Sequence, residues 1–126
     1  MNARYQIVLA IVAGVALGAA AVQGLHAQAK PKAYLIGETE ALDAAAIAAY
    51  GPLIRAAIDG AGGRRLNTPG GKSVVFAGDA PKRIAISEWD SLEKAQAFIN
   101  SDAYKNLAPQ RDKAVKTIRS YAVELN

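Results

Sequence analysis

The chain contains no cysteine and only one histidine, and this scarcity excludes many common chemistries. Without cysteine there is no disulfide bond, no thiol nucleophile and no lipid-modified amino-terminal cysteine. The single histidine, His26, lies in an amino-terminal segment that we expect to be removed. The remaining domain then cannot form a Ser-His or Cys-His pair, and it lacks the usual ligands of zinc and haem iron. We therefore expect no metal site and no cofactor.

The first 29 residues have the order of a secretory signal peptide. Arg4 and the amino terminus supply positive charge, and residues 7–22 contain only Ala, Val, Leu, Ile and Gly. Ala27 and Ala29 then present the small side chains that a signal peptidase requires. A spanning helix needs about 20 apolar residues, more than this run offers. We predict cleavage after Ala29 and a periplasmic or secreted protein; the alternative is an inner-membrane anchor formed by residues 7–22.

Residues 30–126 are enough for one small domain. A domain of this size buries only about 60–65% of the surface that its unfolded chain exposes, so it is marginally stable alone. Small exported domains commonly compensate with disulfide bonds, which this chain cannot form. We therefore expect the domain to be an oligomer.

The positive charge does not predict a nucleic-acid partner. The formal net charge is +4, but the basic residues are scattered, and Arg64-Arg65 and Lys82-Arg83 are merely adjacent pairs. Nucleic-acid-binding surfaces concentrate their charge in a patch or stripe. We expect these side chains to form an ordinary solvated surface.

The hydrophobic pattern predicts strands and helices in the order βαββαβ. Apolar residues on both faces predict a central strand over residues 33–39, and alternation predicts strands over residues 82–89 and 115–125. Residues 64–68 and 73–77 predict the two parts of a strand or a hairpin arm. This order predicts an α+β domain with the ferredoxin-like split arrangement and an antiparallel sheet.

The first predicted helix begins after Asp43, a favourable N-cap. An apolar stripe follows at three- and four-residue spacing, formed by Ile47, Tyr50, Ile54 and Ile58. Pro52 lacks an N–H group and clashes with the preceding turn, so we predict a break at Gly51 and a second helical piece after it.

The second helical region has two predicted starts. Asp90 with Glu93 three residues later has the pattern of a capping box. Asn100-Ser101-Asp102 predicts a new cap, after which residues 103–114 continue as a helix that Pro109 bends or restarts.

Glu38 and Glu88 are candidates for acid–base chemistry. The first and third strands of a ferredoxin-like sheet are neighbours, so two carboxylates near the strand ends can approach each other. Paired carboxylates can separate their pKa values and act as acid and base. The alternative, which we favour, is that each meets Arg, Lys or solvent.

A pocket between the sheet and the helices is the second candidate site. Its candidate lining residues are Tyr34, Phe76, Arg83, Trp89 and Tyr104, with Asn100 and Ser101 at its mouth. The alternative for the aromatic residues Trp89 and Phe76 is a place in the core or an interface. For Asn100 and Ser101 the alternative is a helix cap.

Several of these stretches resemble a known family, the domain of unknown function 1330. The resemblance rests on Ala33–Glu38, Asp43 with Tyr50, Gly62-Gly63-Arg64, Trp89–Glu93, and Asn100-Ser101 with Tyr104. The Asn-Ser-x-x-Tyr element is the most specific of these, and Asp102 within it stands where the family usually has Pro. The resemblance implies a dimeric α/β barrel, in which two ferredoxin-like sheets pack face to face. It implies no reaction and no catalytic residues.

We therefore expect an exported homodimer that binds a small apolar or aromatic molecule without a metal. The alternative is a cofactor-independent enzyme of the monooxygenase or isomerase kind found on this barrel fold. In that case Glu38 or Glu88 is the candidate base, and Tyr104 or Arg83 would stabilise an anion. The sequence does not decide between a binding protein and an enzyme.

Overall fold

The computed structural model describes residues 30–68 and 71–126, and the expectations for residues 1–29 lie outside this part of the chain. Pro31–Asn126 form one unit. Its elements are β1 (Ala33–Ala41), α2 (Ala44–Gly60), β2 (Arg64–Arg65), β3 (Arg83–Trp89), α3 (Leu92–Ile99), α4 (Asp102–Lys105), α5 (Ala108–Ala114) and β4 (Val115–Glu124).

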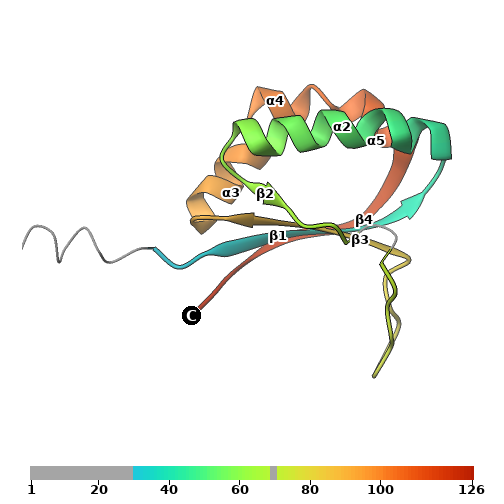
Figure 1. Ribbon diagram of the computed structural model, residues 1–126, viewed down its shortest axis with the longest axis horizontal. Helices are drawn as coiled ribbons and strands as arrows, with labels where there is room; N and C mark the ends of the chain where they lie inside the picture. The colour runs from blue at the N-terminus through green and yellow to red at the C-terminus, as the bar shows by residue number, and fades with distance from the viewer. Residues whose placement is uncertain (1–29, 69–70) are drawn as a thin grey trace, which may run out of the picture. The chain divides into compact units, whose positions relative to one another are not determined.

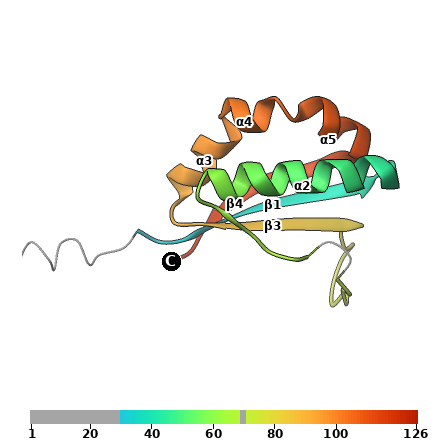
Figure 2. The same ribbon diagram turned by 45° about the horizontal axis from the view of Figure 1, so that its top comes forward.

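The four strands form one antiparallel sheet in the order β2-β3-β1-β4. The first strand is central, as its apolar residues on both faces predicted, and the last strand pairs beside it. All the helices lie on one side of this sheet (Figures 1 and 2). The predicted α+β class and antiparallel sheet are therefore confirmed.

Alternation along the strands gives the sheet two distinct faces. On β1, Leu35 and Gly37 point toward the helices, whereas Tyr34, Ile36 and Glu38 point to the side that no helix covers, which we call the open face. Antiparallel partners share a face, so the register assigns the residues of β3 and β4 in the same way.

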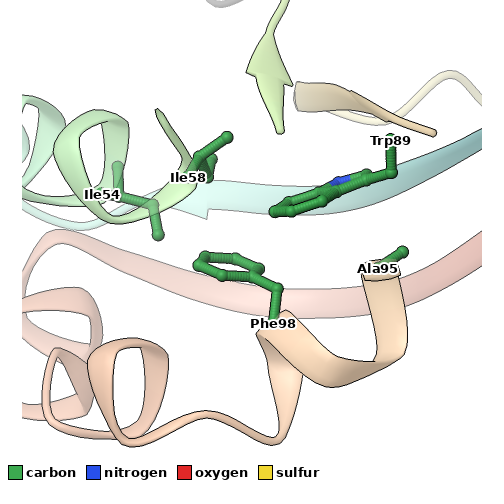
Figure 3. Close-up of a cluster of buried hydrophobic side chains, with 5 residues drawn as sticks. All are labelled: Ile54, Ile58, Trp89, Ala95 and Phe98. Carbon is green, nitrogen blue, oxygen red and sulfur yellow. The ribbon is translucent and has the colours of Figure 1, made fainter. Parts of the chain in front are cut away.

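The core lies where the end of β3 meets α2 and α3. Trp89 and Phe98 are almost fully buried, with ring centroids 4.9 Å apart, and Ile54, Ile58 and Ala95 pack with them (Figure 3). The indole N–H of Trp89 donates to the Ser87 hydroxyl over 2.9 Å, which satisfies its one polar atom.

The predicted break at Gly51 is wrong, because α2 runs unbroken through Pro52. The apolar stripe on either side of the proline packs on the sheet, with Ile54 and Ile58 buried. Pro52 is exposed, and so is Ala48, the residue whose carbonyl loses its helical partner. Burial of one continuous stripe outweighs the local cost of the proline.

The observed helix caps agree only in part with those predicted from the sequence. Asp43 caps α2 as predicted, accepting from the N–H of Ala46 at 2.6 Å. Ser91, not Asp90, caps α3 by accepting from the N–H of Lys94, so the predicted cap is one residue too early. Asp90 instead pairs with the Lys94 ammonium at 3.3 Å.

The residues between β2 and β3 do not form the predicted strand over residues 73–77. Regular pairing ends with Arg65, although the N–H of Leu66 and the hydroxyl of Thr68 still donate to carbonyls of β3. Residues 71–82, which we call the arm, contain neither helix nor strand. Apolar side chains there have no sheet to pack on, and Phe76 is 95% exposed.

No helix in the described ranges 30–68 and 71–126 is long and apolar enough to cross a membrane.

Gly63 is required by the packing of Trp89. A Cβ at this position would lie 2.6 Å from the indole ring, so Gly63→Ala should force the ring out of its place and cost about 1–3 kcal/mol. Differential scanning calorimetry should show a melting temperature lower by roughly 5–20 °C. Gly60→Ala, where a Cβ meets nothing within 4 Å, is the matched control and should not lower it. Equal melting temperatures for the two variants would contradict this account.

Candidate functional site

A partly enclosed cavity of ≈ 120 Å³ lies between the sheet and the helices. Its apolar walls include Leu35 of β1, Ile47 and Ile54 of α2, and Phe98 of α3. Gly37 forms part of its floor, and a Cβ there would meet nothing within 4 Å. An apolar cavity of about 150 Å³ accommodates benzene, and this cavity, at ≈ 120 Å³, is slightly smaller and also has polar groups in its walls.

Three arginines line the same cavity, from three different elements: Arg65 of β2, Arg83 of β3 and Arg111 of α5. Arg65 donates to the carbonyl of Gly51 at 3.4 Å. Burial, and then the neighbouring charges of Arg55 and Arg83, lower the pKa of the Arg65 guanidinium. Arg65 and Arg83 are therefore close enough to repel each other.

Arg111 is the most constrained of the three. Its guanidinium carbon lies 4.9 Å from the ring centroid of Tyr104, a cation–π arrangement, and its Nε is 3.4 Å from Asp112. Its Nη1 atom is buried and has no hydrogen-bond partner among the described residues. A buried donor without a partner costs free energy, and such atoms are rare in folded proteins.

Tyr50 adds a hydroxyl to this group. Burial, followed by the neighbouring Tyr104, raises its pKa to about 12, and it lies within electrostatic range of Arg65 and Arg111. Tyr50 therefore stays neutral at physiological pH and keeps its O–H as a donor. Further hydroxyls in the lining come from Thr39, Thr117, Ser87 and Ser120.

No Asp or Glu is among the residues of the described ranges that line the cavity. Asp112, which pairs with Nε of Arg111, is not itself a lining residue. A half-buried space with three guanidinium groups and no carboxylate in its walls has a positive potential, which favours an anion.

Glu38 lies on the open face and not in the cavity. Arg119 of β4 binds it through two hydrogen bonds, Nε to Oε2 at 2.6 Å and Nη2 to Oε1 at 2.7 Å. These bonds from Arg119 hold the pKa of the Glu38 carboxyl below its ordinary value.

Glu88 lies on the open face at the other end of the strands. It accepts from Lys32 at 2.8 Å, from the Tyr34 hydroxyl at 2.9 Å and from Arg64 at 3.0 Å. Hydrogen bonds from Lys32 and Tyr34 are the main reason that the pKa of Glu88 is lowered.

The two glutamates are not a pair. Glu88 is opposite Tyr34 in the β1–β3 register, whereas Glu38 is opposite Ile84, four residues further along each strand. This offset corresponds to about 13 Å along the strands. Each carboxylate instead meets its own cations, which is the alternative that the sequence analysis favoured.

The other candidate residues are divided between the cavity and places away from it. Arg83 and Tyr104 line the cavity. Trp89 is in the core with 1% of its surface exposed, and Phe76 is in the arm. Tyr34 points to the open face, where it donates to Glu88.

Asn100 and Ser101 lie at the turn between α3 and α4. Ser101 caps α4 by accepting from the N–H of Tyr104 at 3.3 Å, and its own hydroxyl donates to the Phe98 carbonyl at 2.6 Å. Asn100 lines a separate shallow depression beside β4. The cap fixes where Tyr104 enters the cavity.

Sequence reasoning missed Tyr50, Arg65 and Arg111 as site residues. A signal for Arg111 was present, because it follows Tyr104 by seven residues, or two helical turns. Arg64 and Arg65 are neighbours on one strand, so their side chains point to opposite faces of the sheet, and Arg65 is the one on the helix side. Nothing in the sequence showed that these side chains converge.

Within residues 30–68 and 71–126, no group of three or more His, Cys, Asp or Glu side chains is arranged to hold a metal ion.

The fold and the cavity define an α+β domain with a four-stranded antiparallel sheet and helices on one side. The family model for the domain of unknown function DUF1330 matches residues 32–124, and the chain belongs to this family. The earlier resemblance to this family is thereby confirmed. No curated protein matches the chain.

Two crystal structures share the fold. The RPA0582 protein of unknown function from Rhodopseudomonas palustris is 18% identical, with a TM-score of 0.56 over 83% of this chain and 89% of that one. The methylated RPA0582 protein is 16% identical, with a TM-score of 0.58 over 84% and 90%.

Glu38 should make stability depend on acid pH. Because its folded-state pKa lies below the ordinary 4.5, its contribution is complete above that value and is lost as pH falls through the folded pKa. Glu38→Gln should therefore lower the melting temperature at pH 7 but have a smaller effect at about pH 3. Thermal unfolding followed by circular dichroism at both pH values tests this.

Glu40→Gln is the control, because its ion pair with Lys82 is solvent-exposed and should matter little at either pH. An effect of Glu38→Gln that is the same at pH 3 and pH 7 would show that ionisation of Glu38 does not stabilise the fold.

Proposed function

We propose that this protein is an exported homodimeric domain that binds a small apolar or aromatic molecule in the cavity between its sheet and helices. The cavity itself carries the proposal, because it combines apolar walls with a few polar groups that converge from different elements. Such a composition is typical of small-molecule sites. Export rests on the order of charge, apolar run and small residues in the first 29 residues.

The open face supports the homodimer. The residues that give it an apolar centre are Tyr34, Ile36, Ile84, Ile86, Tyr121 and Val123. Ile36 is opposite both Ile86 and Tyr121, so one apolar row crosses three strands. Tyr121 and Val123 are 43% and 45% exposed. A sheet commonly buries such a face against a second sheet about 10 Å away.

The arm supports the same association. Val74, Val75 and Phe76 are 75%, 54% and 95% exposed. In both views the arm leaves the sheet on the side away from the helices (Figures 1 and 2). A second sheet on the open face would lie beside it and cover apolar surface that a lone chain exposes.

The enzyme alternative has less support. Its candidate bases, Glu38 and Glu88, lie on the open face and are hydrogen-bonded to cations that lower their pKa. A general base works best with a pKa near the working pH, so these shifts go in the wrong direction.

Native mass spectrometry of the protein isolated from the periplasm should give a dimer of chains that begin at Lys30. Val123→Arg places a charge in the apolar centre of the open face and should yield monomer at micromolar concentration. Leu53→Arg is the matched control, since Leu53 has nearly the same exposure, 43%, but lies on α2. A monomeric wild type, or dimers of both variants, would contradict dimerisation through the open face.

Gly37→Leu should close the cavity without disturbing the fold, because a Cβ at Gly37 meets only open space and glycine is a poor strand residue. Amide NMR spectra should show benzyl alcohol perturbing lining residues such as Ala85 and Ser120 in the wild type, with millimolar affinity. Gly37→Leu should lose these shifts while its melting temperature stays the same or rises.

Gly60→Leu adds the same side chain at the end of α2, outside the cavity lining, and should bind benzyl alcohol like the wild type. Shifts that persist in Gly37→Leu, or a wild type that shows none up to about 50 mM, would contradict binding in this cavity.

A further inference from the structure

Within the described part of the chain, two of the three cavity arginines have no counterion, and the third is only partly paired. Among the described residues, Arg65 and Arg83 have no carboxylate within ion-pair distance. Arg111 meets Asp112 through Nε only, and its buried Nη1 atom stays unpaired. By contrast, Arg64 and Arg119 on the open face each bind a glutamate.

This arrangement costs the isolated fold free energy. Partly buried guanidinium groups lose hydration, like charges repel, and an unpaired buried donor is unfavourable. Apolar side chains of similar length would fill the same positions without these costs. Groups that oppose folding in this way are typical of binding and catalytic sites.

We propose that the cavity recognises the carboxylate of a small organic acid with an apolar body, through Arg65, Arg83 and Arg111. This inference rests on the proposed function, because it names the class of ligand for the same cavity. Arg111 lines the cavity from the helix side and has a donor atom, Nη1, without a partner in the described ranges, and Arg65 and Arg83 add donors from the sheet side. Tyr50 interacts electrostatically with both Arg65 and Arg111, and its neutral hydroxyl supplies a further donor.

The walls select the rest of the ligand. The surfaces beyond the cations are aliphatic and aromatic, including Leu35, Ile54 and Phe98. The volume of ≈ 120 Å³ suits a single ring or a short branched chain. A guanidinium fork matches the two oxygens of a planar carboxylate, so a monocarboxylate such as benzoate satisfies both ends of the cavity.

Three probes of similar size but different charge test whether the cavity prefers an anion. Benzoate, benzyl alcohol and benzylamine are titrated into the intact protein and followed by the amide NMR shifts of the lining residues. Benzoate should bind at least tenfold more tightly than benzyl alcohol, and benzylamine should not bind. Raising the salt concentration should weaken benzoate and leave the alcohol unchanged.

The outcomes separate the inference from the proposed function. If benzyl alcohol and benzoate bind equally well, the cavity is a ligand site and the carboxylate assignment is overturned. If none of the probes shifts the lining residues, both fail. Tighter binding of inorganic phosphate than of benzoate would also overturn the assignment.

Substitution of the arginines identifies the groups that bind. Arg65→Met and Arg83→Met should each weaken benzoate at least tenfold with little change for benzyl alcohol. Neither should lower the melting temperature, because the removed charge was unpaired. Lys94→Met removes an exposed cation outside the lining and should change benzoate affinity less than twofold.

Arg111 needs a gentler change, because its guanidinium also packs on Tyr104. Arg111→Lys keeps the charge and most of the stem but loses the planar fork, and it should weaken benzoate several-fold while the protein stays folded. Unchanged benzoate affinity in Arg65→Met, Arg83→Met and Arg111→Lys would overturn the inference.

Discussion

The close approach of the Trp89 indole to Gly63, which leaves no room for a Cβ, joins the elements at this end of the sheet. Trp89 ends β3 and stacks on Phe98 of α3, and Gly63 connects α2 to β2. One contact therefore fixes the end of α2, the start of α3 and the edge strand relative to the sheet. Because β2 is only two residues long, its position depends on this anchor more than on its own ladder. Arg65 reaches the cavity from that strand, so the core packing also places part of the site.

Because side chains alternate along the strands, charged residues that are adjacent in the sequence lie on opposite faces of the sheet. Arg64 and Arg65 are adjacent, yet the first binds Glu88 on the open face and the second lines the cavity. On the open face every acid described above has cationic partners, and the charges flank an apolar centre. On the helix side, within residues 30–68 and 71–126, Arg65 and Arg83 have no carboxylate partner, Arg111 has only Asp112, and the surrounding walls are apolar or carry hydroxyls. The same sheet thus has one face on which the charges are paired around an apolar centre and another on which cations gather among apolar walls.

Local patterns in the sequence predicted the elements well, because alternation and capping act over a few residues. The β1 and β3 faces, the Asp43 cap and the last strand followed from these signals. The errors arose where distant packing decides. Pro52 stays within α2 because the sheet holds the stripe on both sides of it, and residues 73–77 lack a partner strand despite their strand-like composition. Of the cavity residues, Arg83 and Tyr104 were identified, whereas Arg65 and Arg111 depend on the convergence of separate elements, which no local pattern encodes.

A bulge in β4 opposite Glu38 and Thr39 explains how Thr117 comes to line the cavity. Pairing of β1 with β4 shifts between Glu38 and Thr39, so Arg119 is opposite Glu38, Thr117 is opposite Thr39, and Ile118 is the extra residue. Without the shift, Ile118 would stand opposite Thr39 and face the helices. The bulge instead turns Thr117 into the cavity, leaves Ile118 45% exposed, and buries Val115. Bulges often re-aim side chains next to functional sites. Here the bulge keeps the Glu38–Arg119 pair on the open face while polar donors and acceptors replace an isoleucine beside the arginines.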